Sequence, residues 1–125
     1  MTKPQGEVAI QTLAMPADTN ANGDIFGGWL VSQMDLAAGV LAKKLARGRV
    51  ATVAINSMSF LKAVHVGDVV SCYVLLLSQG KTSMTIKVEV WAQPVDQSPA
   101  YKVTDGNFVF VAIDDHGRPR PVVTL

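Results

Sequence analysis

The hydrophobic and polar positions divide the chain into a short strand, a polar loop, one long helix and a series of strands. Residues 7–13 are strand-like, and residues 16–28 are rich in Pro, Asp, Asn, Thr and Gly, which is typical of an ordered loop. Residues 28 to about 45 contain frequent alanine and leucine and no proline, which predicts a helix. Arg47 and Gly48 then provide the expected helix stop.

Four further strand-like stretches follow the helix. They are residues 50–60, 69–77, 82–92 and 101–113, with turns predicted at 79–81 and 114–117. In the third stretch the alternation is regular, so that Met84, Ile86, Val88 and Val90 share one face. Because only one helix lies between strands, a repeated βαβ parallel sheet is excluded. The short connections favour an α+β fold, with an antiparallel sheet of about five strands packed on the helix.

The predicted helix is apolar on several of its faces. Trp29, Leu30, Met34, Leu36 and Val40 are spread around it rather than along one stripe. Such a helix is normally buried on most sides, and a sheet covers only one flank. A second copy of the chain is the simplest cover for the remainder, so we expect an oligomer.

One acidic residue, Asp35, lies in the middle of this apolar helix. No basic residue is three or four positions away to pair with it, and its row on the helix consists of Gly28, Ser32 and Gly39. These small residues predict a groove with one carboxylate at its centre. A carboxylate there is costly to bury unless it is hydrogen-bonded or its pKa is raised, and such carboxylates are candidate catalytic groups. A structural aspartate, bonded to a nearby loop or facing solvent, is the open alternative.

Two glycines open the helix, Gly27 and Gly28. Backbone amides at a helix N-terminus attract negative charge, and glycines let a substrate approach closely, although helix–sheet packing also explains such a pair. Gly28 and Asp35 are seven residues apart, roughly 10 Å along the axis. An oxyanion donor must lie about 3 Å from the developing charge. One helix therefore cannot present both groups to one carbonyl, which predicts sites shared between two helices related by a twofold axis.

Composition and charge narrow the remaining classes. A chain of 125 residues suits a single domain, residues 1–125, and 49% hydrophobic residues argue against general disorder. The net charge of +1, without a run of like charges, gives no overall field for nucleic acid. No stretch is long and apolar enough for a signal peptide or a membrane span, and the single Cys72 excludes an internal disulfide, so we expect a cytoplasmic protein. His65 and His116 are isolated, so we expect no metal site.

The segments 20–29 and 32–35 closely resemble the signature of hotdog-fold acyl-CoA thioesterases of the YciA type. The similarity continues through residues 48–50, 60–62, 66–68, 87–91 and 103–105. It implies a curved antiparallel sheet wrapped around one long central helix. It also implies hydrolysis of acyl-CoA without a metal or bound cofactor, CoA being part of substrate and product. Homodimers, often assembled as trimers of dimers, are the implied partners.

The resemblance also implies roles for individual residues. Asp35 matches the catalytic acid of the family, as general base or as direct nucleophile, and the Gly27 and Gly28 amides match the helix end that polarises the carbonyl. Asn20 matches an asparagine used across the interface, whereas on sequence grounds it orients a water or carbonyl, or holds its loop.

Several further residues are candidates for substrate binding, and two other functions stay open. Ser32 and Gly39 line the predicted groove. The candidates for the CoA phosphates are Lys62, Lys81, Ser83, Arg118 and Arg120, with a solvated surface group as the alternative for each. A dehydratase or hydratase of the same fold would require a histidine near the helix, and none is there. A non-catalytic acyl-CoA binding module would keep the groove without needing Asp35.

Overall fold

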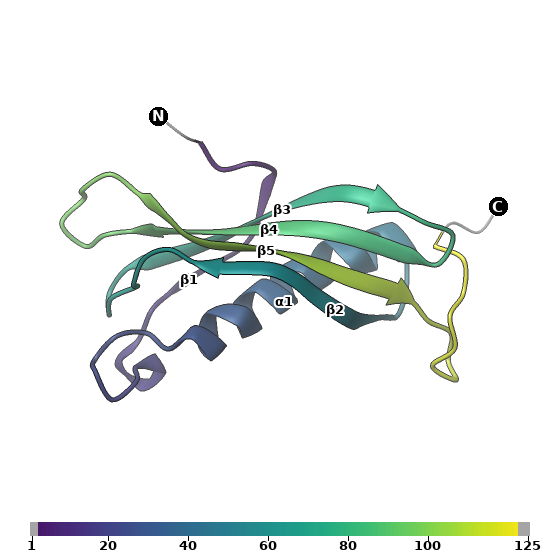
Figure 1. The fold of residues 1–125 in the computed structure, drawn as a ribbon, viewed down its shortest axis with the longest axis horizontal. Coiled ribbons are helices and arrows are strands. Elements are labelled where there is room, and N and C mark those ends of the chain that lie inside the picture. The colour runs from purple at the N-terminus through teal and green to yellow at the C-terminus, as the bar shows by residue number, and fades with distance from the viewer. Residues whose placement is uncertain (1–2, 123–125) are drawn as a thin grey trace.

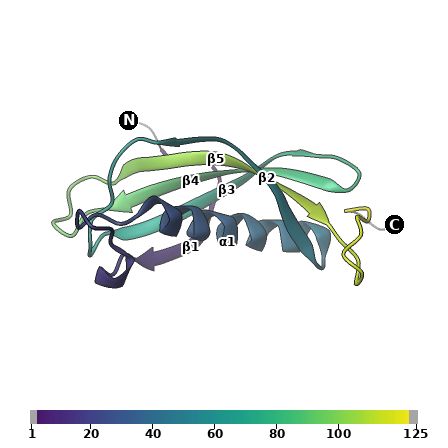
Figure 2. The ribbon, with the colours of Figure 1, turned by 60° about the horizontal axis from the view of Figure 1, so that its bottom comes forward.

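The fold is one long helix packed along one face of a five-stranded antiparallel sheet (Figures 1 and 2). The computed structural model describes residues 3–122. Its elements are β1 (Glu7–Leu13), a 3-10 turn η1 (Pro16–Asp18), α1 (Gly27–Ala46), β2 (Val50–Phe60), β3 (Val69–Gln79), β4 (Ser83–Gln93) and β5 (Tyr101–Ala112). The strands lie in the order β1-β3-β4-β5-β2, and every neighbouring pair is antiparallel. This confirms the architecture expected from the element order and from the hotdog resemblance.

Helix α1 occupies the predicted stretch, extended by one residue at each end. Phe26 precedes it with an extended backbone, and Arg47 ends it in the left-handed conformation (φ 54°), its amide donating to the Lys43 carbonyl. Arg47 rather than Gly48 thus takes the left-handed position that glycine usually occupies. Arg120 reinforces this end, since its guanidinium donates to the Ala46 carbonyl at 2.9 Å.

The core lies between α1 and the inner face of the sheet. The predicted alternation of β4 is confirmed, because Met84, Ile86, Val88 and Val90 are all fully buried. Met34 on α1 is equally buried against them. The opposite side of the helix stays uncovered, with Leu36 59% and Val40 40% exposed. One chain therefore covers only part of the apolar helix, as the sequence predicts.

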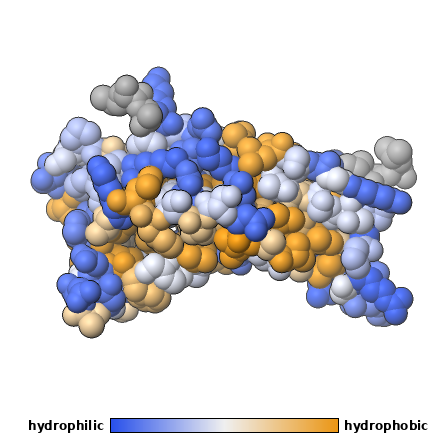
Figure 3. All heavy atoms as spheres, viewed as in Figure 1, coloured by the Kyte–Doolittle hydropathy of each residue, from blue (hydrophilic) through white to orange (hydrophobic). Residues whose placement is uncertain are grey.

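Strand β2 forms one edge of the sheet, and its pairing with β5 is interrupted twice. The register shifts between Thr52 and Ala54 and again between Asn56 and Ser59, where one extra residue is inserted in β2. Each extra residue reverses which side chains face the helix. The first insertion turns Ile55 to the inner side, and the second restores the original alternation, so that Thr52, Ile55 and Phe60 all pair with inner-facing residues of β5. Apolar residues gather over β2 and α1 in Figure 3.

Several boundaries differ from the sequence prediction. The loop at residues 16–28 contains the turn η1 and a bridge between Thr19 and Ile25. Strand β3 runs two residues further than predicted, because Ser78 and Gln79 still pair with β4 after a register shift. The hairpin turn therefore lies at residues 80–82. No helix within residues 3–122 is long and apolar enough to cross a membrane.

Candidate active site

The Asp35 carboxylate lies on the side of α1 that faces the edge strand β2. Its Oδ1 atom accepts a hydrogen bond from the Thr52 hydroxyl at 2.6 Å. Asp35 is half-buried and Thr52 is exposed, and no lysine, arginine or histidine of residues 3–122 pairs with this carboxylate. One carboxylate oxygen is therefore held by a neutral donor, beside an edge strand that no other strand of the chain covers.

The start of α1 leaves its first backbone amides without partners. Among residues 3–122, no hydrogen bond to the amides of Gly27 or Gly28 is present, while the Trp29 amide donates to the Phe26 carbonyl at 3.1 Å. Phe26 at the N-cap offers no side-chain acceptor, and the first turn contains no acidic residue. A Ser, Thr, Asp or Asn cap usually stabilises a helix by about 1 kcal/mol. The chain forgoes that stabilisation and leaves free donors at the positive end of the helix dipole.

Packing explains the second glycine better than the first. A methyl group on Gly28 would lie 3.1 Å from the Phe26 ring, which is tight, whereas one on Gly27 would lie 3.6 Å from the Phe60 ring, an ordinary contact. Gly27 does not adopt a positive φ. Neither backbone conformation nor packing within one chain therefore requires glycine at position 27, and close approach by another molecule is the remaining physical reason.

Within one chain the carboxylate and the amides are too far apart for one carbonyl. Asp35 is the ninth residue of α1, so eight residues separate it from Gly27. At 1.5 Å rise per residue this is roughly 12 Å along the helix axis. The two functional groups thus lie on the same helix but not in the same site.

The side chain of Asn20 holds its own loop. Its Oδ1 accepts hydrogen bonds from the backbone amides of Asn22 at 2.8 Å and Asp24 at 3.2 Å. This is the loop-holding role that the sequence left open for Asn20.

Ser32 and Gly39, predicted to line the groove with Asp35, have local partners. The Ser32 hydroxyl is exposed and donates to the Trp29 carbonyl at 2.7 Å. A methyl group on Gly39 would lie 3.8 Å from the Phe110 ring, so this glycine faces the sheet. Ser32 therefore lies on the exposed side of α1, whereas Gly39 lies on the side that packs against the sheet.

The candidates for phosphate binding separate to opposite ends of the molecule. Lys62 follows β2 near the start of α1, with its ammonium group 5.3 Å from the centre of the Tyr101 ring. Lys81 in the β3–β4 turn, Ser83 at the start of β4 and Arg118 in the C-terminal turn lie at the end of α1. Lys81 and Arg118 are exposed there, and Ser83 is half-buried.

The contacts of Arg120 favour a structural role. Its guanidinium donates to three carbonyls, those of Ile113 at 3.0 Å, Pro121 at 3.1 Å and Ala46 at 2.9 Å. Three of its five N–H groups are thus occupied within the chain. A phosphate would have to displace these bonds.

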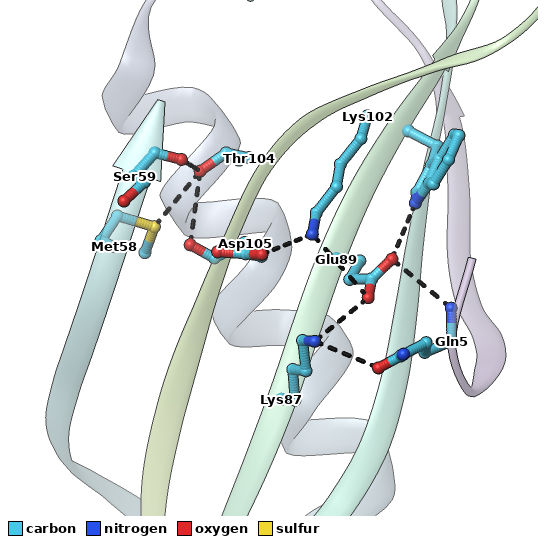
Figure 4. A network of polar contacts seen from close by, with 9 residues as sticks. Gln5, Met58, Ser59, Lys87, Glu89, Lys102, Thr104 and Asp105 are labelled. Atoms are coloured by element: carbon cyan, nitrogen blue, oxygen red, sulfur yellow. Dashed lines mark hydrogen bonds and ion pairs between the residues drawn. The ribbon is translucent and has the colours of Figure 1, made fainter. Parts of the chain in front are cut away.

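A polar network that the sequence did not reveal covers the outer face of the sheet (Figure 4). The buried Glu89 carboxylate accepts the Trp91 indole N–H at 2.9 Å and pairs with Lys87 at 3.4 Å and Lys102 at 4.0 Å. Lys102 also pairs with Asp105, whose hydrogen bond raises the pKa of this lysine. Two positive and two negative charges balance, so the network contains no unpaired acid or base.

Two other features lie apart from Asp35. A cavity of about 670 Å³ on the outer face is lined by residues that include Tyr73, Trp91 and Gln11, but by none of the predicted site residues. Cys72 is buried, and burial raises the pKa of its thiol to about 12, which makes it a core residue rather than a nucleophile. Residues 3–122 contain no group of three His, Cys, Asp or Glu side chains placed to hold a metal ion.

Comparison with known proteins identifies the family to which this chain belongs. A model of the thioesterase superfamily matches residues 22–98, which contain the whole of α1, β2, β3 and β4. The acyl-CoA thioester hydrolase YciA of Salmonella typhimurium is 55% identical over 122 residues, covering 95% of this chain and 92% of that protein. The chain belongs to the YciA family of acyl-CoA thioester hydrolases.

Two solved structures similar to this chain are hexamers. The hexameric thioesterase y2039 from Yersinia pestis superposes with a TM-score of 0.94 at 52% identity, covering 98% of this chain and 100% of that one. HI0827, a hexameric broad specificity acyl-coenzyme A thioesterase, was solved as a variant with an aspartate replaced by alanine. It superposes with a TM-score of 0.92 at 53% identity, covering 95% of this chain and 88% of that one.

Three residues around this candidate site were missed by sequence reasoning. Thr52 contacts Asp35, and Phe60 and Phe26 contact the two glycines. Thr52 and Phe60 lie on the helix side of β2, and the pairing of this edge strand with β5 cannot be read from the local pattern of either strand. For Phe26, an aromatic residue at a position that usually carries a polar cap was the available signal.

Proposed function

We propose that this chain hydrolyses acyl-CoA to a free acid and CoA, with Asp35 activating the attacking water. The Asp35–Thr52 hydrogen bond carries this proposal, because it holds a carboxylate on an otherwise apolar helix beside an open sheet edge. Membership in a family of acyl-CoA thioester hydrolases supports the same reaction. The aspartate-to-alanine variant of HI0827 supports an acidic side chain as the group that acts in the reaction.

The proposed sites are shared between two copies of the chain. Asp35 and Gly27 are roughly 12 Å apart along one helix, so a partner's helix must supply the second group. The open edge of β2 and the exposed side chains Leu36 and Val40 provide apolar surface for such a partner. The hexameric relatives support an assembly of this kind, with a trimer of dimers as the proposed arrangement.

In the proposed reaction, the Gly27 and Gly28 amides of one copy bind the thioester carbonyl oxygen. Asp35 of the other copy takes a proton from water while the water oxygen attacks the carbonyl carbon. The tetrahedral oxyanion is stabilised by the amides, and its collapse breaks the C–S bond and releases the CoA thiolate. Because a thiolate is a good leaving group, the scheme needs neither a strong acid nor a metal or bound cofactor.

An alternative route uses the same residue differently. Asp35 attacks the carbonyl directly, the thiolate leaves, and water then hydrolyses the resulting anhydride. In both routes the Thr52 hydroxyl orients the carboxylate by occupying Oδ1. Hydrolysis in ¹⁸O-labelled water under single-turnover conditions tests for the anhydride route, since label enters Asp35 only when water attacks the Asp35 carbonyl of an anhydride.

Binding of the CoA portion completes the proposal. Lys62 is the phosphate candidate beside the start of α1, and Lys81, Ser83 and Arg118 are the candidates at its other end. Which of these groups binds the CoA phosphates depends on how the two copies meet.

We place the reaction in the cytoplasm, since a free buried cysteine is compatible with a reducing compartment.

The test measures CoA release with a thiol-detecting reagent for Asp35→Asn and Asp35→Ala. We expect kcat to fall about 10²- to 10⁴-fold in both, the range contributed by a general base. Asp115→Asn is the matched control, because Asp115 is exposed and its side chain makes no hydrogen bond within residues 3–122. Unchanged hydrolysis in both Asp35 variants removes Asp35 from the mechanism. Acyl-CoA binding without turnover in the unmodified protein supports the binding module instead.

A further inference from the structure

Two phenylalanine rings flank the free amides at the start of α1. A methyl group on Gly27 would lie 3.6 Å from the Cε1 and Cζ atoms of Phe60, and one on Gly28 would lie 3.1 Å from Cε2 of Phe26. Successive residues of a helix point roughly 100° apart around its axis. The rings therefore cover two adjacent sides of the helix end and leave the direction of the amides open.

The two rings reach the helix end from different parts of the chain. Phe26 is the N-cap residue itself, and its backbone is tied by its amide, which donates to the Asp18 carbonyl at 3.1 Å. Phe60 is the last residue of β2 and pairs with Thr104. The two extra residues of β2 reverse its alternation twice, so Phe60 lies on the same inner face as Thr52. The end of this edge strand thus places an aromatic ring at the amides.

Both rings keep substantial exposed surface although they are large and apolar. Phe26 is 42% exposed and Phe60 is 52% exposed. Neither is part of the buried core. Apolar area beside free hydrogen-bond donors is suited to a ligand that has a polar acceptor next to apolar carbons, and a thioester of an alkyl acid has this composition.

We propose that Phe60 and Phe26 determine which acyl groups the site accepts, by packing against the carbons next to the thioester carbonyl. This inference rests on the proposed function, because it assumes that the carbonyl oxygen binds the Gly27 and Gly28 amides. The rings favour acyl groups whose first carbons are apolar, such as butyryl and hexanoyl. They disfavour acyl groups with an ionised carboxylate near the carbonyl, such as malonyl and succinyl, because a charge against phenyl rings loses its hydration.

The expected effect follows from the area that the rings cover. Each methylene group removed from water raises kcat/KM roughly fourfold. Butyryl-CoA has two more methylene groups than acetyl-CoA, so full burial of both against the rings changes the ratio of their kcat/KM values by roughly 16-fold. Phe60→Ala therefore lowers this ratio about tenfold, mainly through KM, and Phe60→Leu restores most of it because leucine keeps the apolar bulk.

The experiment measures kcat and KM for acetyl-, butyryl-, hexanoyl- and succinyl-CoA in the assembled protein and its variants. Phe26→Ala provides a second, independent variant, since its side chain makes no hydrogen bond. Leu61→Ala is the matched control, because Leu61 is adjacent in the chain and 60% exposed but contacts neither glycine. We expect the Leu61 variant to keep the profile of the unmodified protein.

The outcomes separate this inference from the proposed function. If the unmodified protein releases CoA from no substrate, the proposed function fails. If it is active and both Phe60→Ala and Phe26→Ala keep its butyryl-to-acetyl ratio, the inference is wrong while the function stands. A uniform loss for all substrates, with a lowered Tm or smaller species in sedimentation, assigns the rings to folding or assembly and also overturns the inference.

Discussion

The substitution Gly27→Pro removes a single amide hydrogen from the proposed site. Gly27 is the first residue of α1, where proline is favoured because its missing N–H has no partner within the helix. Phe26 before it has ψ 149°, the extended conformation that precedes proline most readily. The Cβ atom of the new residue would lie at ordinary contact distance, 3.6 Å, from the Phe60 ring. The backbone at the helix start therefore tolerates the change.

The expected effect on catalysis is large, whereas the effect on stability is small. Loss of one oxyanion-hole donor lowers kcat about 10²- to 10³-fold, equivalent to about 2.7–4 kcal/mol of transition-state stabilisation. A compatible change to proline alters the free energy of unfolding by less than about 1 kcal/mol, in the stabilising direction, because the unfolded chain loses freedom. A severe loss of activity in a protein of unchanged stability is thus the specific expectation.

The assay compares kcat for butyryl-CoA and the urea unfolding midpoint in Gly27→Pro and Gly27→Ala. Both variants add a Cβ at the same place, but only alanine keeps the amide, so the ratio of their kcat values isolates the hydrogen bond. Equal kcat in the two variants would refute the role of the Gly27 amide. A large drop in unfolding midpoint for proline would refute the claim that this helix start accommodates it.

Four further predictions test the remaining assignments. Mixed oligomers of Asp35→Asn and Gly27→Pro chains should regain about a quarter of the wild-type sites. Half of randomly formed twofold dimers contain one chain of each kind, and each such dimer has one intact site of two. Absence of rescue would place each site within one chain. Thr52→Val should lower kcat by about tenfold or more, since hydrogen bonds to charged groups contribute about 1.5–3 kcal/mol, whereas Thr52→Ser should retain activity. Arg120→Ala should lower the free energy of unfolding by about 1–3 kcal/mol and leave KM for acyl-CoA unchanged, and a raised KM at unchanged stability would return Arg120 to the phosphate site. Burial raises the pKa of the Cys72 thiol from 9.0 to about 12, so the unfolded chain loses this proton at lower pH than the folded chain does. The free energy of unfolding should therefore fall as pH rises from 9 towards 12, and it should fall less in Cys72→Ala. Urea titrations at several pH values measure this difference.

Local patterns in the sequence predict the elements and their layering. The one long helix, the five strands and the inner face of β4 follow from local periodicity, which is a property of neighbouring residues. Asp35 was found because an acid without a basic neighbour is an anomaly within an apolar helix, and Gly27 and Gly28 were found because a glycine pair at a helix start leaves its amides accessible. Their spacing also predicted a shared site, since helical rise is the same in every chain.

Which side chains contact Asp35 and the glycine amides depends on contacts between distant parts of the chain. Thr52 and Phe60 lie on the inner side of β2, which faces α1, and the register of β2 with β5 leaves no trace in the local pattern of either strand. The same applies to Arg120, whose partner Ala46 lies 74 residues away in the chain, so that a candidate phosphate ligand emerges as a helix cap. Periodicity is encoded in adjacent residues, whereas contacts across a sheet edge depend on how whole elements align.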